Sequence, residues 1–134
     1  MADTVEFELV APERLMMSAP VSMIVIPGAE GDFGVLPGHT PMISTIRTGV
    51  IDVYDGDNVD KRVFVSGGFA EVTDERCTVL ADEAVSLDEA DRETADQRLV
   101  AAREALEDAE DDAARARAER EIEVSQALIE AING

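Results

Sequence analysis

His39 is the one histidine of the chain and the side chain best suited to acid–base chemistry near neutral pH. A small hydrolase or isomerase built on His39 would need a nucleophile or a carboxylate partner within a recognisable motif. No nucleophile-elbow sequence surrounds Ser18, Ser22, Ser44 or Ser66. One cysteine and one histidine, without zinc or calcium spacing, do not make a metal site. The sequence therefore gives the enzyme hypothesis no partner residues, and we expect no metal and no cofactor.

Glycines gather around this histidine, at positions 28, 31, 34 and 38. They follow neither of the glycine patterns that open a phosphate-binding helix. We interpret them as residues that shape turns and a bulge. Gly67 and Gly68 similarly predict a bend between two strands.

The acidic charge of the chain excludes several classes of partner. The net charge is −19, and residues 82–134, with 17 acidic and 6 basic side chains, carry −11 of it. Nucleic acids and anionic membrane surfaces need clustered Lys and Arg, so neither is expected as a direct partner. Cys77 has no second cysteine to pair with, and its neighbours predict a buried strand residue. Because no signal peptide or membrane-spanning run is visible, we expect a soluble, cytoplasmic protein.

Short runs of strand-forming residues, separated by Gly and Pro, fill residues 1–85. Val5, Phe7 and Leu9 alternate with glutamates, which indicates a half-buried strand. Asp55–Asn58 predicts a hairpin turn. About eight to ten such strands, with frequent turns, are typical of an antiparallel sandwich or barrel.

The pattern changes near Ser86, and residues 86–134 predict a charged helical arm. Leu87–Asn133 contains neither Pro nor Gly and is rich in helix formers. Ser86 is the predicted N-cap, because acidic residues follow it in the first turn. Glu107–Asp112 holds five carboxylates, which favour a helix start, so we expect a break there and a second helix over about Ala114–Ile132. One continuous helix across this block is the alternative.

Several motifs, taken in order, resemble one known family. Glu30–Pro41 matches the pattern E-G-x-x-G-x-x-P-G-H-x-P of the epsilon subunits of bacterial F-type ATP synthases. Ser66–Val72 and Val79–Ala84 follow in the same order, and Leu87–Ala90 opens the helical arm as in that family. The resemblance covers essentially the whole chain. It implies an N-terminal antiparallel β-sandwich of about ten strands and a C-terminal α-helical hairpin, in agreement with the residue patterns.

The resemblance also implies a function. Members of the family are non-catalytic parts of the rotor of a proton-translocating complex, at the cytoplasmic face of the bacterial inner membrane. The sandwich holds the gamma subunit and sits on the ring of c subunits. By motif position, Glu30 and Asp32 fall in the loop that faces the c-ring, where polar loops commonly offer Arg. Gly38, His39 and Pro41 fall in the segment associated with the gamma and ring contacts.

For the helical arm, the resemblance implies a regulatory role. In many relatives the arm extends along gamma and inhibits ATP hydrolysis, through basic residues that meet the alpha/beta catalytic head. Arg115, Arg117 and Arg120 are the candidates for these contacts here. Glutamates on the same helix oppose the attraction, so inhibition is a hypothesis.

Some relatives also bind ATP in the folded hairpin, with the pattern I/L-D-x-x-R-A at the start of its first helix. In this chain Asp91 takes the place of the arginine, and Arg92 is displaced by one position, which is about 100° around a helix. An aspartate repels phosphate. We therefore interpret Asp88 and Arg92 as vestiges of a nucleotide site and do not expect ATP to bind.

A generic β-sandwich adaptor, whose acidic helical arm recruits a basic partner, is the alternative interpretation. Co-purification of the chain with a gamma subunit would separate it from the rotor subunit.

Overall fold

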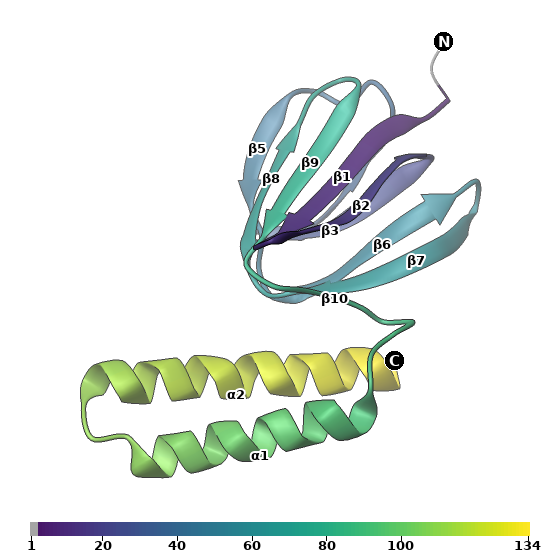
Figure 1. The fold of residues 1–134 in the computed structure, drawn as a ribbon. Helices are drawn as coiled ribbons and strands as arrows, with labels where there is room; N and C mark the ends of the chain where they lie inside the picture. The colour runs from purple at the N-terminus through teal and green to yellow at the C-terminus, as the bar shows by residue number, and fades with distance from the viewer. Residues whose placement is uncertain (1–2) are drawn as a thin grey trace. The chain divides into compact units, whose positions relative to one another are not determined.

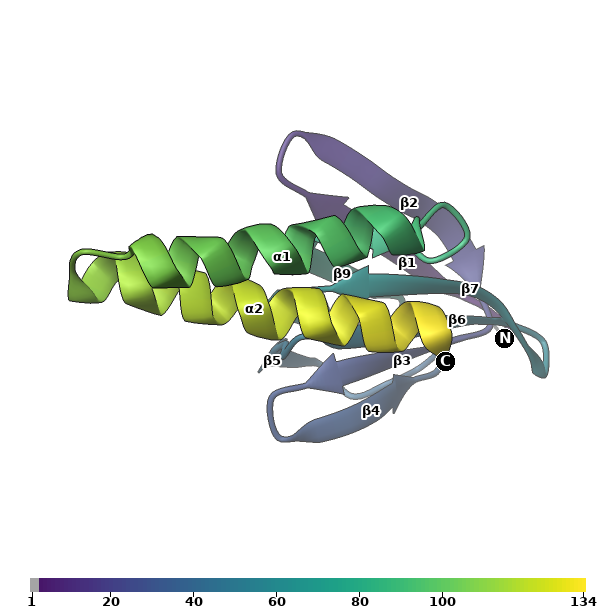
Figure 2. The same ribbon diagram turned by 90° about the horizontal axis from the view of Figure 1, so that it is seen from below.

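Ten strands followed by two helices make up residues 3–134, the part of the chain that the computed structural model describes (Figure 1 and Figure 2). The chain divides into two compact units, Met1–Asp88 and Glu89–Gly134. The strands all belong to the first unit and both helices to the second. These elements confirm the predicted fold class, a β-sandwich followed by a helical hairpin.

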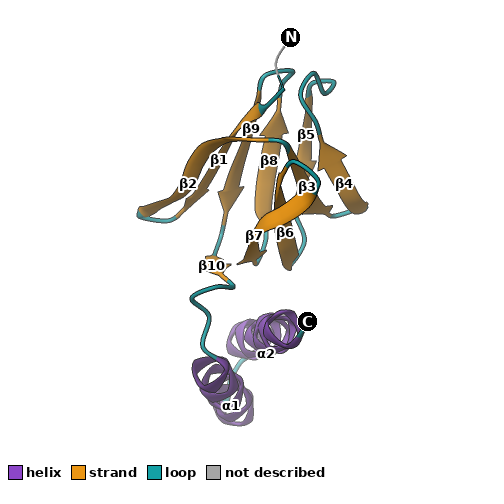
Figure 3. Ribbon diagram, turned by 90° about the vertical axis from the view of Figure 1, so that its right-hand side faces the viewer, coloured by secondary structure: helices purple, strands orange, loops and turns teal. Residues whose placement is uncertain are grey.

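Two five-stranded sheets form the sandwich and pack face to face (Figure 3). The first sheet contains, in spatial order, β2 (Arg14–Val21), β1 (Val5–Ala11), β9 (Arg76–Ala81), β8 (Gly68–Val72) and β5 (Met42–Thr45). The second contains β10 (Ala84–Ser86), β7 (Asn58–Val65), β6 (Gly49–Asp55), β3 (Met23–Gly28) and β4 (Gly31–Val35). Neighbouring strands are antiparallel except β1 and β9, which run parallel.

Alternate strand residues fill the space between the sheets. Val5, Phe7 and Leu9 of β1 are at most 1% exposed, as their alternation with glutamates predicts. Ile24 and Ile26 of β3 are fully buried in the same core cluster. Each such side chain contributes about 1.5–3 kcal/mol of hydrophobic stabilisation, so the core fixes the register of the strands.

Cys77 lies in β9 and is fully buried in this core, which confirms the prediction of a buried strand cysteine. Burial raises the pKa of the Cys77 thiol to about 12, because the thiolate would lose its hydration. The thiol is therefore protonated and unreactive at neutral pH. Its contribution to stability is complete below the ordinary thiol pKa and is lost as the pH rises toward the raised value.

The second unit is a hairpin of α1 (Arg92–Asp108) and α2 (Asp112–Asn133). The helix breaks at Ala109, whose backbone is extended, and the Asp111 carboxylate then accepts a hydrogen bond from the Ala114 amide at 2.7 Å. Acidic residues repel the C-terminus of one helix and favour the N-terminus of the next. The predicted break is confirmed, and the alternative of one continuous helix is wrong.

Ser86 does not cap a helix, contrary to the prediction. It ends β10, where it pairs with Val63 of β7. The N-cap of α1 is Asp91, whose carboxylate accepts a hydrogen bond from the Glu93 amide at 3.3 Å. A three-residue strand is too short to show alternation, so the sequence pattern did not reveal β10.

Strand β2 was also missed by the sequence pattern. It forms the edge of its sheet, and most of its residues are exposed or half-buried, so no clear alternation marks it. A bulge between Leu9 and Val10 shifts its register against β1. Leu15 is consequently the partner of Val10.

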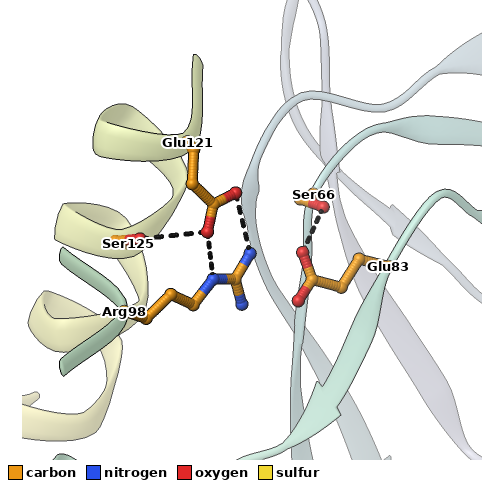
Figure 4. A network of polar contacts seen from close by, with 5 residues as sticks. All are labelled: Ser66, Glu83, Arg98, Glu121 and Ser125. Atoms are coloured by element: carbon orange, nitrogen blue, oxygen red, sulfur yellow. Dashed lines mark hydrogen bonds and ion pairs between the residues drawn. The ribbon is translucent and has the colours of Figure 1, made fainter. Parts of the chain in front are cut away.

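The predicted bend at Gly67 and Gly68 is present, with φ angles of 85° and 120°. On its N-terminal side, the Ser66 hydroxyl donates a hydrogen bond to Glu83 Oε1 at 3.2 Å (Figure 4). A Cβ atom at position 68 would lie 2.1 Å from the Leu80 carbonyl oxygen. Strands β8 and β9 can therefore pair at this point only through a glycine.

We expect Gly68→Ala to lower the free energy of unfolding of the sandwich by more than about 3 kcal/mol, through clash and strain. Urea titration, monitored through the fluorescence of Tyr54, measures this free energy of unfolding. Gly56→Ala is the matched control, because φ is 63° there and no atom lies within 4 Å of the new Cβ. Its cost should be about 1–2 kcal/mol. Equal losses in the two variants would contradict the role of Gly68.

Candidate functional site

The tip of the β3–β4 hairpin, residues 28–32, carries both carboxylates that the sequence singles out. Gly28 pairs with Gly31, so only Ala29 and Glu30 form the loop, and Asp32 follows in β4. A Cβ atom at position 28 would meet the Gly31 carbonyl oxygen at 2.7 Å, so this tight turn requires glycine. Glu30 and Asp32 are both exposed. The tip is thus a narrow acidic projection on a short loop.

Arg47, just after β5, holds this tip. Its amide donates a hydrogen bond to the Pro27 carbonyl at 2.9 Å. Its guanidinium donates from Nη1 to the Gly28 carbonyl at 2.8 Å and pairs through Nη2 with Asp32 Oδ1 at 2.6 Å. Sequence reasoning missed Arg47, because it lies 15 residues from Asp32 and only the sheet register brings them together.

The loop between β4 and β5 carries Gly38, His39 and Pro41. The Gly38 amide donates to the Asp74 carbonyl at 2.8 Å, which ties the loop to the turn between β8 and β9. His39 Nδ1 lies 2.6 Å from the Thr40 carbonyl oxygen, and a carbonyl only accepts, so Nδ1 carries a proton. Within residues 3–134 no carboxylate or nucleophile bonds to the ring, so a catalytic triad is not assembled there.

The outer face of the first sheet bears an apolar row that sequence reasoning missed. Leu15, Val10, Leu80 and Phe69 are successive register partners across β2, β1, β9 and β8, and we call these four the apolar row. Leu15 is 58% exposed, Phe69 45% and Leu80 41%. A groove beside the row is lined by Val10, Phe69, Leu80, Ala11, Pro12 and Asp82. The run Val79–Ala81 is apolar on both faces of its strand, and this pattern was the sequence signal that could have indicated part of the row.

Further exposed apolar side chains lie near the edge of this face. Ile43 of β5 is 71% exposed and is the register partner of Glu71, on the outward side of the same sheet. Leu36, in the loop with His39, is also exposed. Monomeric proteins seldom expose large contiguous apolar surface, so these residues mark a candidate contact face.

Polar contacts fix the register of the two helices of the hairpin. The Arg98 guanidinium bonds both carboxylate oxygens of Glu121, Nε to Oε1 and Nη2 to Oε2, the latter at 3.2 Å (Figure 4). The fully buried Ser125 donates to Glu121 Oε1 at 3.3 Å. Near the hairpin ends, Arg92 Nη1 donates to Asn133 Oδ1 at 2.5 Å. A bidentate pair is geometrically specific, so it selects one alignment of α1 on α2.

Asp91 and Arg92, at the start of α1, form polar contacts within the hairpin. Asp91 accepts hydrogen bonds from the Thr94 hydroxyl at 2.6 Å and from the Glu93 amide, and these bonds lower the pKa of Asp91, the Thr94 bond most. Arg92 is engaged with α2, and Asp88 lies exposed in the turn before α1. At this helix start, Asp91 and Arg92 therefore bond within the hairpin, and Asp88 faces solvent.

Arg115, Arg117 and Arg120 lie exposed on the first half of α2. Within residues 3–134 none of the three forms an ion pair, so their charges are available to an outside anionic group. Arg117 lines a groove between the two helices that is otherwise rich in alanine. The three side chains fall within less than two turns of α2.

Residues 3–134 contain no group of three or more His, Cys, Asp or Glu side chains that could hold a metal ion. Neither α1 nor α2 is long and apolar enough to cross a membrane.

Comparison with known proteins gives consistent matches along the whole chain. The family model for the ATP synthase Delta/Epsilon chain, beta-sandwich domain, matches residues 4–87. The ATP synthase epsilon chain of Rhodospirillum rubrum is 52% identical over 134 residues, which cover 100% of both chains. The ATP synthase epsilon chain of Rhodospirillum centenum is 54% identical over 138 residues, covering 98% of this chain and 94% of the relative.

Solved structures agree. A chain of the Euglena gracilis mitochondrial ATP synthase, in an OSCP/F1/c-ring structure in rotational state 1, has a TM-score of 0.81 and 28% identity. The match covers 98% of this chain and 83% of that one. A chain of the Tetrahymena thermophila mitochondrial ATP synthase central stalk and c-ring shares the fold, with a TM-score of 0.63, 14% identity and 96% coverage of both chains.

The Asp91 carboxylate caps α1, and its contribution depends on pH. Asp91→Ala should speed amide hydrogen exchange at Glu93, because the helix loses its N-cap, whereas Asp91→Asn should preserve slow exchange. The pKa of Asp91 is lowered in the folded state, so the carboxylate contributes stability above the ordinary carboxyl pKa. That contribution is lost as the pH falls through the lowered value. Exchange at Glu93 that is unchanged in Asp91→Ala would show that Asp91 does not cap α1.

Proposed function

The chain belongs to the ATP synthase epsilon-chain family, and from this premise we propose that it joins the gamma subunit to the c-ring without catalysing a reaction itself. It is a subunit of the rotor stalk of the ATP synthase. The observation that carries the coupling role is the exposed apolar row on the first sheet, which a free-standing sandwich would have no reason to keep in water.

The apolar row is the proposed contact for gamma. Interfaces that stay assembled are centred on apolar and aromatic side chains surrounded by a polar rim. Phe69 and Leu80 supply the centre, and Asp82 and Glu13 line the adjoining groove as a polar rim. A rotor part that transmits torque needs such a lasting interface rather than a transient one.

The tip of the β3–β4 hairpin is the proposed contact for the c-ring. Glu30, in the two-residue loop, and Asp32, in β4, are both exposed there. Cationic side chains on loops of the ring would donate charge-assisted hydrogen bonds to these carboxylates. Such bonds fix the register of an interface more than they add affinity. Such a contact suits an interface between this chain and the c-ring, which turn together.

The loop with Gly38, His39 and Pro41 is proposed to take part in both of these contacts. It is tied to the body of the sandwich through Gly38 and carries the exposed Leu36. We assign it to the gamma and ring contacts, with His39 as a contact residue rather than a general base. The whole subunit would then sit peripherally, at the cytoplasmic face of the inner membrane.

The helical hairpin is proposed to regulate hydrolysis through Arg115, Arg117 and Arg120, which would meet acidic segments of the alpha/beta catalytic head. The absence of ion pairs to these three side chains within residues 3–134 supports this role. The N-cap role of Asp91 argues against regulation through bound ATP, because the position that would hold a phosphate-binding arginine carries a carboxylate.

Substitution in the apolar row tests the gamma contact. We expect Phe69→Asp to weaken binding of the chain to gamma by at least about tenfold, because it places a charge in the desolvated centre of the interface. Titration calorimetry or surface plasmon resonance with purified gamma measures the affinity. Val59→Asp is the control, since Val59 is 43% exposed and lies on β7, in the other sheet. Equal affinities for Phe69→Asp and the unsubstituted chain would refute the assignment.

Removal of residues 89–134 tests regulation. If the arm inhibits the catalytic head, ATP hydrolysis by the assembled enzyme should rise by about fivefold, the lower end of typical coupling between sites. Replacing Arg115, Arg117 and Arg120 together by Gln should act in the same direction. Hydrolysis at the original rate in the shortened form would show that the arm does not inhibit.

A further inference from the structure

We propose that Arg47 is a positioning residue for the c-ring contact, which holds the Asp32 carboxylate and the tip of the β3–β4 hairpin in the orientation that meets the ring. The inference rests on the proposed function, because it takes the tip to face the ring. It concerns a residue outside the tip itself. Arg47 acts through Asp32 and is not assigned a contact with the ring.

The guanidinium of Arg47 bridges the two strands of the hairpin. Nη1 donates to the Gly28 carbonyl, at the end of β3, and Nη2 pairs with Asp32 Oδ1, in β4. The two distances are 2.8 and 2.6 Å. A planar guanidinium can serve two acceptors at once in a fixed fork, and a lysine ammonium lacks this fork.

The backbone that carries Arg47 is itself anchored. Ile46 is 3% exposed, belongs to the core cluster and forms a bridge with Gly28. On either side, the Arg47 amide bonds the Pro27 carbonyl and the Ala29 amide bonds the Thr45 carbonyl, each at 2.9 Å. The guanidinium therefore projects from a base that is fixed by the core.

One oxygen of Asp32 is left for a partner. Oδ1 takes the bond from Arg47, while Oδ2 has no hydrogen bond within residues 3–134, and the side chain is 60% exposed. An ionised carboxylate accepts more than one donor, so Oδ2 can receive a cationic side chain of the ring. Because Arg47 already restricts the rotamer of Asp32, less conformational entropy is lost when the ring binds.

The test uses the complete ATP synthase in inverted membrane vesicles, with proton pumping measured per ATP hydrolysed. Asp32→Asn and Arg47→Gln should each lower this ratio by about two- to fivefold, the range expected for an exposed charge pair. The double variant should be no worse than Asp32→Asn alone, because Arg47 acts through Asp32. Arg47→Lys should restore only part of the ratio.

The matched control is Arg62→Gln. Arg62 Nε pairs with Asp52 Oδ1 at 3.1 Å across β6 and β7 and has no proposed role in the ring contact. The Arg62 side chain is 42% exposed, close to the 46% of Arg47. This variant should pump like the original enzyme. The melting temperature of each isolated chain is measured in parallel, and we expect it to stay close to that of the original chain, since exposed ion pairs contribute little to stability.

The results separate the proposed ring contact of the tip from the positioning role of Arg47. If Glu30→Gln and Asp32→Asn both leave pumping unchanged, the tip does not face the ring, and the proposed contact fails together with this inference. If they lower pumping but Arg47→Gln leaves it unchanged or raises it, only the role of Arg47 fails. Additive losses in the double variant, or losses in both Arg47→Gln and Arg47→Lys that follow a fall in melting temperature, would also overturn the positioning role.

Discussion

Burial of the inner strand faces between two sheets is the constraint on which the rest of this structure depends. Phe7, Val79 and Ala70 must lie inside, and because side chains alternate along a strand, this fixes what lies outside. The register that buries them brings Val10, Leu80 and Phe69 into one outward row. A slip of one residue in any strand would exchange its two faces. The apolar row is therefore a direct consequence of how the core is built.

The same core also positions the acidic tip of the β3–β4 hairpin. Ile46 is held inside the sandwich, and the next residue, Arg47, reaches from that fixed point to Gly28 and Asp32. Rigidity at the tip thus comes from the burial of Ile46, which forms a bridge with Gly28, and the ion pair orients Asp32. In the hairpin, a polar network sets the alignment instead, because the facing residues are largely alanine and bury little area. The two units of the chain are specified by different forces.

Sequence patterns predicted those elements that depend on local chemistry. The alternation in β1, the turn at Asp55–Asn58, the buried Cys77 and the helix break near Asp111 follow from neighbouring residues. Strands β2 and β10 were missed because an edge strand and a three-residue strand carry no clear periodicity. The full apolar row and the Arg47–Asp32 pair arise only when distant segments take one register, so the run Val79–Ala81 could indicate Leu80 but not the other members of the row. Motif position, by contrast, pointed to the acidic tip at Glu30 and Asp32.

We propose that this chain couples the turning stalk to proton flow. The most direct measurement compares membranes carrying the complete ATP synthase with membranes from which this subunit has been removed and then restored. ATP hydrolysis and ATP-driven proton pumping are recorded together. We expect removal to leave hydrolysis but to abolish pumping, and adding back the chain to restore pumping. Pumping that continues at its original yield per ATP without the subunit would show that the chain does not couple the stalk to proton flow.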